Sequence, residues 1–71
     1  NVFLQKVNTL IDQHMEDAGF LVDELSKEVG MNRSQLYRKL KALTGKSTVA
    51  YMRSRRLHEA NRLLLIGELN V

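Results

Sequence analysis

The segment NRSQLYRKLKALTG, residues 32–45, constrains the fold more than any other part of the chain. Asn32 is a favourable helix N-cap, and Gln35, three residues later, completes a capping-box-like pair. Gly45 stands where a helix would end in a left-handed conformation. Successive helical residues turn by about 100°, so every third or fourth residue shares a face. One face of the predicted helix is apolar and contains Leu36, Leu40 and Leu43.

The opposite face of this helix carries hydrogen-bonding and cationic side chains, namely Ser34, Tyr37, Arg38 and Lys41. Taken alone, such a face is more typical of an ordinary solvated helix surface than of a binding surface. The sequence on either side of the helix reverses this interpretation.

A short helix is predicted just before this segment, over residues 21–29. Asp23 and Glu24 lie in its first turn, where the helix dipole favours negative charge, although Leu21 and Val22 are both poor N-caps. Gly30 is predicted to end it in a left-handed turn. A small residue at Ser26 would let the next helix approach closely. The spacing of four recurring positions, Ser26, Gly30, Asn32 and Leu36, is typical of a helix-turn-helix.

Two further helices are predicted. The first, over residues 2–15, is followed by a loop over residues 16–19 in which Gly19 is a plausible end cap. Its buried stripe would contain Phe3, Val7, Leu10, Ile11 and His14. The last, capped by Ser47, would run over residues 48–66, be about 28 Å long, and end at Gly67.

The last helix also has an apolar face, which would contain Val49, Ala50, Met52, Leu57, Ala60, Leu63 and Leu64. Arg53 and Arg56 fall within this arc, so we expect them to pair with carboxylates. The candidate partners are Asp23, Glu24 and Glu28, whereas Arg55 and Arg62 would point the other way. The fold class predicted is therefore all-α, with about four helices and one core that includes Leu25, Leu36, Leu40, Leu57 and Ala60.

Charge is distributed unevenly along the chain. Residues 1–31 contain two basic and six acidic side chains, a net −4, whereas residues 32–62 contain nine basic side chains against Glu59, a net +8. Glu68 then brings the total to the net charge of +3. A basic half that begins at the amphipathic helix favours a polyanionic partner.

Composition argues against several other classes of protein. The chain has no cysteine, which excludes a disulfide framework or thiolate zinc site and suits a reducing, cytoplasmic compartment. Its longest apolar run, residues 63–66, is too short to cross a bilayer. His14 and His58 stand far apart with no metal-binding motif, and no nucleophile, base and orienting group occur at usable spacing. We therefore expect no enzyme, no metal and no cofactor.

Three stretches resemble the DNA-binding domain of the AraC/XylS family of bacterial transcription regulators: Leu25-Ser26 with Gly30-Met31-Asn32, LYRKLKALTGKS at residues 36–47, and YMRSRRLHEANRLLL at residues 51–65. NRSQLYRKLKALTGKS looks closest to the output modules of two-component response regulators and hybrid sensor-regulators. The resemblance implies a leading helix and loop (1–19), a helix-turn-helix (20–45), a linker helix (46–67) and the start of a second helix-turn-helix (68–71).

The resemblance also implies a function, namely sequence-specific binding of double-stranded DNA with residues 32–45 in the major groove. Contacts to bases are implied for Ser34, Tyr37 and Arg38. Contacts to phosphates are implied for Arg33, Gln35, Lys41, Lys46 and Ser47.

The main alternative is a helical protein–protein interaction module, in which the last helix docks a partner and the basic face is incidental. A related expectation is self-association through an apolar cluster at the end of this helix, formed by Leu63, Leu64, Leu65 and Ile66.

Overall fold

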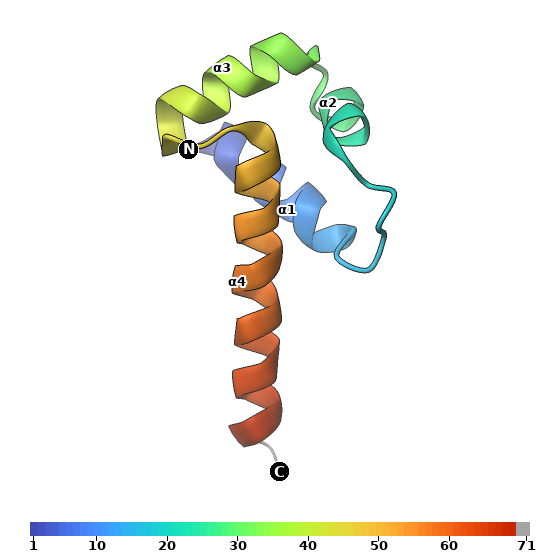
Figure 1. Ribbon diagram of the computed structural model, residues 1–71, viewed down its shortest axis with the longest axis vertical. Coiled ribbons are helices and arrows are strands. Elements are labelled where there is room, and N and C mark those ends of the chain that lie inside the picture. Colours follow the sequence, from blue (N-terminus) through green and yellow to red (C-terminus); the bar gives the residue numbers. More distant parts are fainter. Residues whose placement is uncertain (70–71) are drawn as a thin grey trace.

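A computed structural model describes residues 1–69 and shows a four-helix, all-α arrangement (Figure 1). The helices are α1 (Val2–Gln13), α2 (Val22–Val29), α3 (Arg33–Thr44) and α4 (Thr48–Leu69). The first three helices gather around the beginning of α4, whose remainder projects away from them (Figure 1). The molecule is accordingly elongated, with principal extents of 44 × 23 × 20 Å. The predicted fold class is confirmed.

The hydrophobic core lies where the four helices meet. Its fully or almost fully buried apolar side chains are Val7, Ile11, Phe20, Leu25, Leu36, Leu40 and Met52. His14 stacks on Phe20 with 3.9 Å between ring centroids, and its Nδ1–H donates a hydrogen bond to the carbonyl oxygen of Leu10, 2.8 Å away. These contacts close the core beneath the loop between α1 and α2.

The predicted ends of α3 are confirmed. The Oδ1 atom of Asn32 accepts a hydrogen bond from the Gln35 backbone N–H at 2.8 Å, and the Gln35 side chain accepts one from the Asn32 N–H at 3.1 Å. This reciprocal pair satisfies two donors at the helix start. Gly45 ends the helix with φ of 75°, a conformation that costs glycine nothing.

The end of α1 differs from the prediction. The helix stops at Gln13 with His14 as its C-cap, and Gly19 does not have a positive φ. Instead, successive turns follow, in which Asp17 N–H donates to the His14 carbonyl and Asp17 Oδ1 accepts from the Gly19 N–H at 2.9 Å. The Asp17 side chain, rather than the flexibility of glycine, therefore shapes this loop.

The extent of α4 also differs. Gly67 does not end the helix, which continues to Leu69, and residues 70 and 71 lie outside the described part. Glycine inside a helix costs only about 1 kcal/mol relative to alanine, and strong helix formers precede it.

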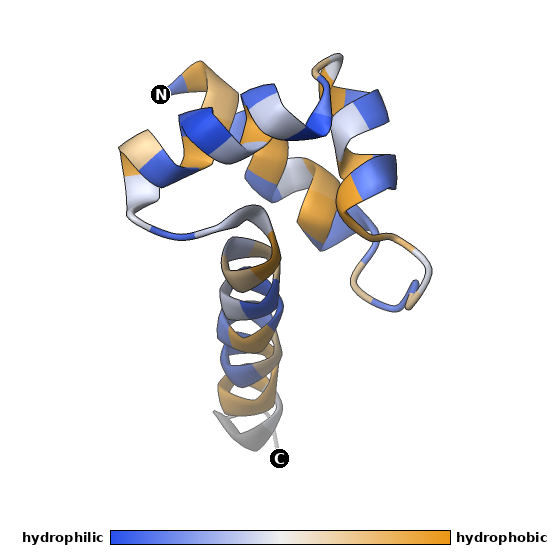
Figure 2. Ribbon diagram, turned by 45° about the horizontal axis from the view of Figure 1, so that its top comes forward, coloured by the Kyte–Doolittle hydropathy of each residue, from blue (hydrophilic) through white to orange (hydrophobic). Residues whose placement is uncertain are grey.

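Several apolar side chains expected in the core are exposed: Leu43 (44%), Val49 (53%), Leu57 (62%), Leu63 (55%) and Leu64 (66%), together with Ala60. For Leu57, Ala60, Leu63 and Leu64 the reason is geometric, because α1 and α3 cover only the first turns of α4 and nothing described covers the rest. Figure 2 shows hydrophobic bands that continue along this projecting part.

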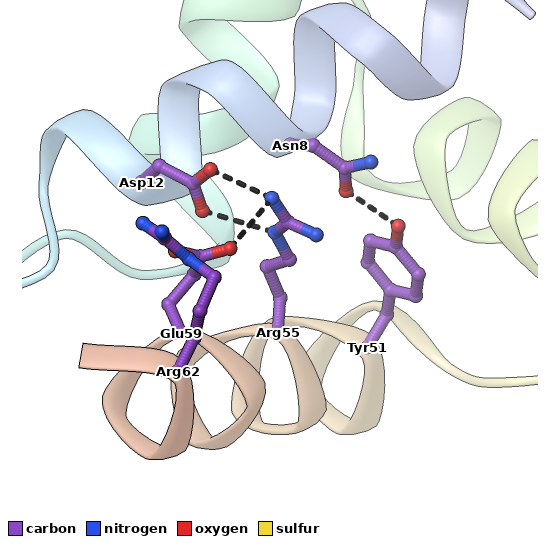
Figure 3. Close-up of polar contacts among 6 residues, drawn as sticks. All are labelled: Asn8, Asp12, Tyr51, Arg55, Glu59 and Arg62. Carbon is purple, nitrogen blue, oxygen red and sulfur yellow. Dashed lines mark hydrogen bonds and ion pairs between the residues drawn. The ribbon is translucent and has the colours of Figure 1, made fainter. Parts of the chain in front are cut away.

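The α1–α4 contact is polar at its edge (Figure 3). Arg55 of α4 donates to both carboxylate oxygens of Asp12 on α1, and it also pairs with Glu59 at 3.0 Å. Arg62 binds the other Glu59 oxygen at 2.9 Å, and the Tyr51 hydroxyl donates to the Asn8 side chain.

The expected ion pairs of Arg53 and Arg56 are wrong. Among residues 1–69 neither side chain forms an ion pair. Arg56 donates through Nη2 to the Phe20 carbonyl at 2.6 Å, and Arg53 is exposed. Asp23 instead pairs with Arg33, because the start of α2 lies beside the start of α3.

Candidate nucleic-acid interface

The exposed face of α3 forms one wall of an open groove. Ser34, Tyr37 and Arg38 all line this groove, which has a volume of about 790 Å³. The other wall comes from Val22 and from the first residues of α4. The three side chains predicted to contact bases are therefore brought together on one accessible surface, at the N-terminal half of a helix that is capped at both ends.

The turn between α2 and α3 sets the position of this face. Gly30 adopts φ of 80°, and its N–H donates to the Ser26 carbonyl at 3.0 Å. Ser26 is only 5% exposed, and its hydroxyl donates to the Val22 carbonyl at 2.8 Å, so a polar side chain is buried without an unmet donor. A left-handed turn and a small buried residue allow α2 and α3 to cross closely.

The five residues predicted to contact phosphates divide into two groups. Arg33 and Ser47 line the groove itself. The other three lie outside its lining and are engaged locally: Gln35 in the α3 capping box, Lys41 with the Gly45 carbonyl at 3.0 Å, and Lys46 with the Ser54 hydroxyl at 2.9 Å.

Charge around the groove is predominantly positive. Arg33 pairs with Asp23 at 3.2 Å, but the two side chains are 71% and 61% exposed, so the pair contributes at most about 1 kcal/mol. Arg38 forms no ion pair with any residue that the structure describes. Both guanidinium groups are thus accessible to an anion.

Sequence reasoning missed part of this groove. Val22, Thr48 and Val49 also line it. Helical periodicity assigned Val49 to the core, because spacing alone does not show which turns of α4 are covered. Thr48 is 4% exposed, and its Oγ1 has no hydrogen-bond partner within residues 1–69. For Thr48, the available sequence signal of a place in the groove was its position directly after the Ser47 cap.

The start of α4 completes the geometry. The Ser47 hydroxyl accepts a hydrogen bond from the Ala50 N–H at 3.2 Å, which confirms it as the N-cap of α4. Remaining N–H groups at such a helix start favour an anion. The groove therefore combines an exposed face of α3 with the positive end of α4.

Two short helices that cross at a left-handed glycine, with the second presenting an exposed polar and cationic face, define a helix-turn-helix protein. The chain belongs to the helix-turn-helix domain family, in its AraC-type form: the family model matches residues 25–71. The function associated with this family is DNA binding in the regulation of transcription. No curated protein and no solved structure matched the chain. No helix in the described residues is long and apolar enough to cross a membrane.

Proposed function

We propose that the chain binds double-stranded DNA sequence-specifically as part of a bacterial transcription regulator, with α3 in the major groove. The observation that carries this proposal is the shared, accessible surface of Ser34, Tyr37 and Arg38 on a helix capped at both ends. A major groove is about 12 Å wide and admits one helix. The proposed role is binding, and we assign the chain no catalytic activity.

Arg38 has the leading role in this proposal. Its guanidinium group matches the O6 and N7 acceptors of guanine, a bidentate contact worth about 1–3 kcal/mol of discrimination. Ser34 and Tyr37 offer hydroxyl groups to neighbouring base edges. Arg33 and Ser47 would bind phosphates beside the groove, while Gln35, Lys41 and Lys46 would bind phosphates further out.

We also propose that the parent protein belongs to a two-component signalling system and acts in the cytoplasm. The feature that supports this affiliation is the stretch NRSQLYRKLKALTGKS, which resembles the output modules of such proteins.

A second candidate function is protein–protein interaction, including self-association through the apolar cluster of residues 63–66. The observation that favours it is the exposure of this cluster, in which Leu63, Leu64, Leu65 and Ile66 are 42–66% exposed. Apolar patches on a projecting helix tend to bind partners. Such binding would use the far end of α4 and leave the α3 face free.

A salt titration separates the two candidates. Binding of a labelled duplex, followed by fluorescence anisotropy, should weaken linearly in a log–log plot with a slope of several, because each phosphate contact releases about 0.9 counterion. Apolar docking would hardly respond to salt. A slope near zero would therefore contradict DNA binding.

A further inference from the structure

A second hollow adjoins the groove. It has a volume of about 470 Å³ and lies between the start of α2 and the first turns of α4. Three residues, Val22, Arg33 and Val49, line both the hollow and the groove. The two features therefore form one continuous surface that leads from α3 towards the side of α4.

The charged lining of the hollow is unbalanced. Three guanidinium groups, from Arg33, Arg53 and Arg56, face one carboxylate, Asp23. Asp23 is already paired with Arg33 in an exposed contact. Arg53 is exposed and forms no ion pair within residues 1–69, while Arg56 is held by backbone carbonyls and keeps a buried Nε without a partner. The hollow thus offers positive charge that the described residues do not neutralise.

The hollow also has an apolar lining, and two of these side chains are more than half exposed. Leu21 occupies the N-cap position of α2, where it forms no side-chain capping bond, yet it is 56% exposed. Val49 is 53% exposed in the first turn of α4. Polar residues would serve both positions at least as well in an unbound chain.

Apolar and cationic groups side by side match the two halves of a DNA backbone unit. The deoxyribose presents C–H surface and the phosphate carries the charge. In a helix-turn-helix bound to DNA, the first helix crosses the backbone beside the groove that the second helix enters. The start of α2 is where such a strand would pass.

We propose that this hollow binds a sugar–phosphate unit of the DNA strand that flanks the major groove. Arg53 contacts the phosphate, with Arg33 beside it, and Leu21 and Val49 pack against the deoxyribose. This inference rests on the proposed function, since it requires α3 to bind DNA. It adds Arg53, Leu21 and Val49 to the contact surface and extends that surface along α4.

The test compares two arginine variants of the whole chain on a duplex of arbitrary sequence, since phosphate contacts do not depend on sequence. Arg53→Gln should lower the log–log salt slope by about 0.9 and weaken binding about eightfold at about 0.1 M salt, the factor that one phosphate contact provides. Arg62→Gln is the matched control, because it removes the same charge from the same helix at a residue that pairs with Glu59. It should leave the slope almost unchanged.

Leu21→Ser tests the apolar half of the site. Serine is a better N-cap, so the thermal unfolding midpoint should stay equal or rise, which excludes misfolding as a cause. Binding should nevertheless weaken severalfold with the salt slope unchanged, because no charge is removed. If the Arg53→Gln and Arg62→Gln slopes are the same, or if Leu21→Ser binds like wild type, the site is refuted. A wild-type chain with no salt-dependent binding refutes the proposed function together with it.

Discussion

Asp12 and Arg55, 43 positions apart in sequence, are joined by two hydrogen bonds, from Nε at 3.0 Å and from Nη2 at 2.8 Å. The two side chains are 34% and 24% exposed, so water screens them only partly. Glu59 holds the same guanidinium group from within α4. This bidentate pair, together with the contact between Tyr51 and Asn8, sets the position of α1 on α4 (Figure 3).

Asp12→Asn should destabilise the domain by about 1–2 kcal/mol, because charge-assisted hydrogen bonds in a partly buried setting contribute more than exposed ones. Asp23→Asn is the control, since it breaks the exposed pair with Arg33 and should cost under about 1 kcal/mol. Urea unfolding followed by far-ultraviolet circular dichroism measures both. Equal losses in the two variants would show that the Asp12–Arg55 pair is no stronger than a surface contact.

The same pair should be insensitive to pH around neutrality. The hydrogen bonds that Arg55 donates to the Asp12 carboxylate raise the pKa of Arg55 above its ordinary value, with attraction from Asp12 and Glu59 adding to the effect and burial opposing it. A raised pKa in the folded state gives stability that is present below the ordinary pKa and lost only as the pH rises through the raised one. The stability difference between wild type and Arg55→Gln should therefore be the same at about pH 7 and about pH 9. A marked decrease of this difference at the higher pH would contradict the assignment.

Gly45→Ala should destabilise the chain by about 1–2 kcal/mol, because φ of 75° is unfavourable for a residue with a Cβ atom. No atom lies within 4 Å of the added Cβ, so the loss would be conformational rather than steric. Gly67→Ala is the opposite case: its position inside α4 has open space, and alanine should favour the helix by up to about 1 kcal/mol. Thermal unfolding of the two variants should thus shift in opposite directions, and shifts of the same sign would refute this account of the two glycines.

The apolar cluster of residues 63–66 should mediate self-association at high concentration. Leu65 and Ile66 are 61% and 42% exposed on the projecting part of α4. Replacing both by lysine adds charge without disturbing the core, so the variant should sediment as a monomer where wild type shows a larger species. Identical monomeric sedimentation of both chains at high concentration would refute the prediction.

The sequence predicted those structural features that are determined by residues close together in the chain. The caps of α3 and the turn at Gly30 follow from side chains within three or four positions, and these predictions are confirmed. The surroundings of α4 depend on which of its turns α1 and α3 cover. The helical periodicity of the sequence carries no information about this. For that reason Leu57 was assigned to the core and is 62% exposed.

The candidate site shows the same division. The exposure of Ser34, Tyr37 and Arg38 followed from the phase of α3 alone. The contribution of Val49 depended on the packing of α4 beside α3, so it was missed. Arg55 was expected to point away from the core, and its partner on α1 could not be deduced from spacing, because the two residues lie on helices far apart in sequence.

Sequence-specific recognition by α3 is tested most directly through the ratio of affinities for a selected and a scrambled duplex. The selected duplex is first enriched from a random pool by the wild-type chain. Arg38→Ala should reduce this ratio by about tenfold or more, because a bidentate base contact is lost, whereas Lys46→Ala should weaken both duplexes equally and leave the ratio unchanged. Equal losses on both duplexes for Arg38→Ala would contradict the account.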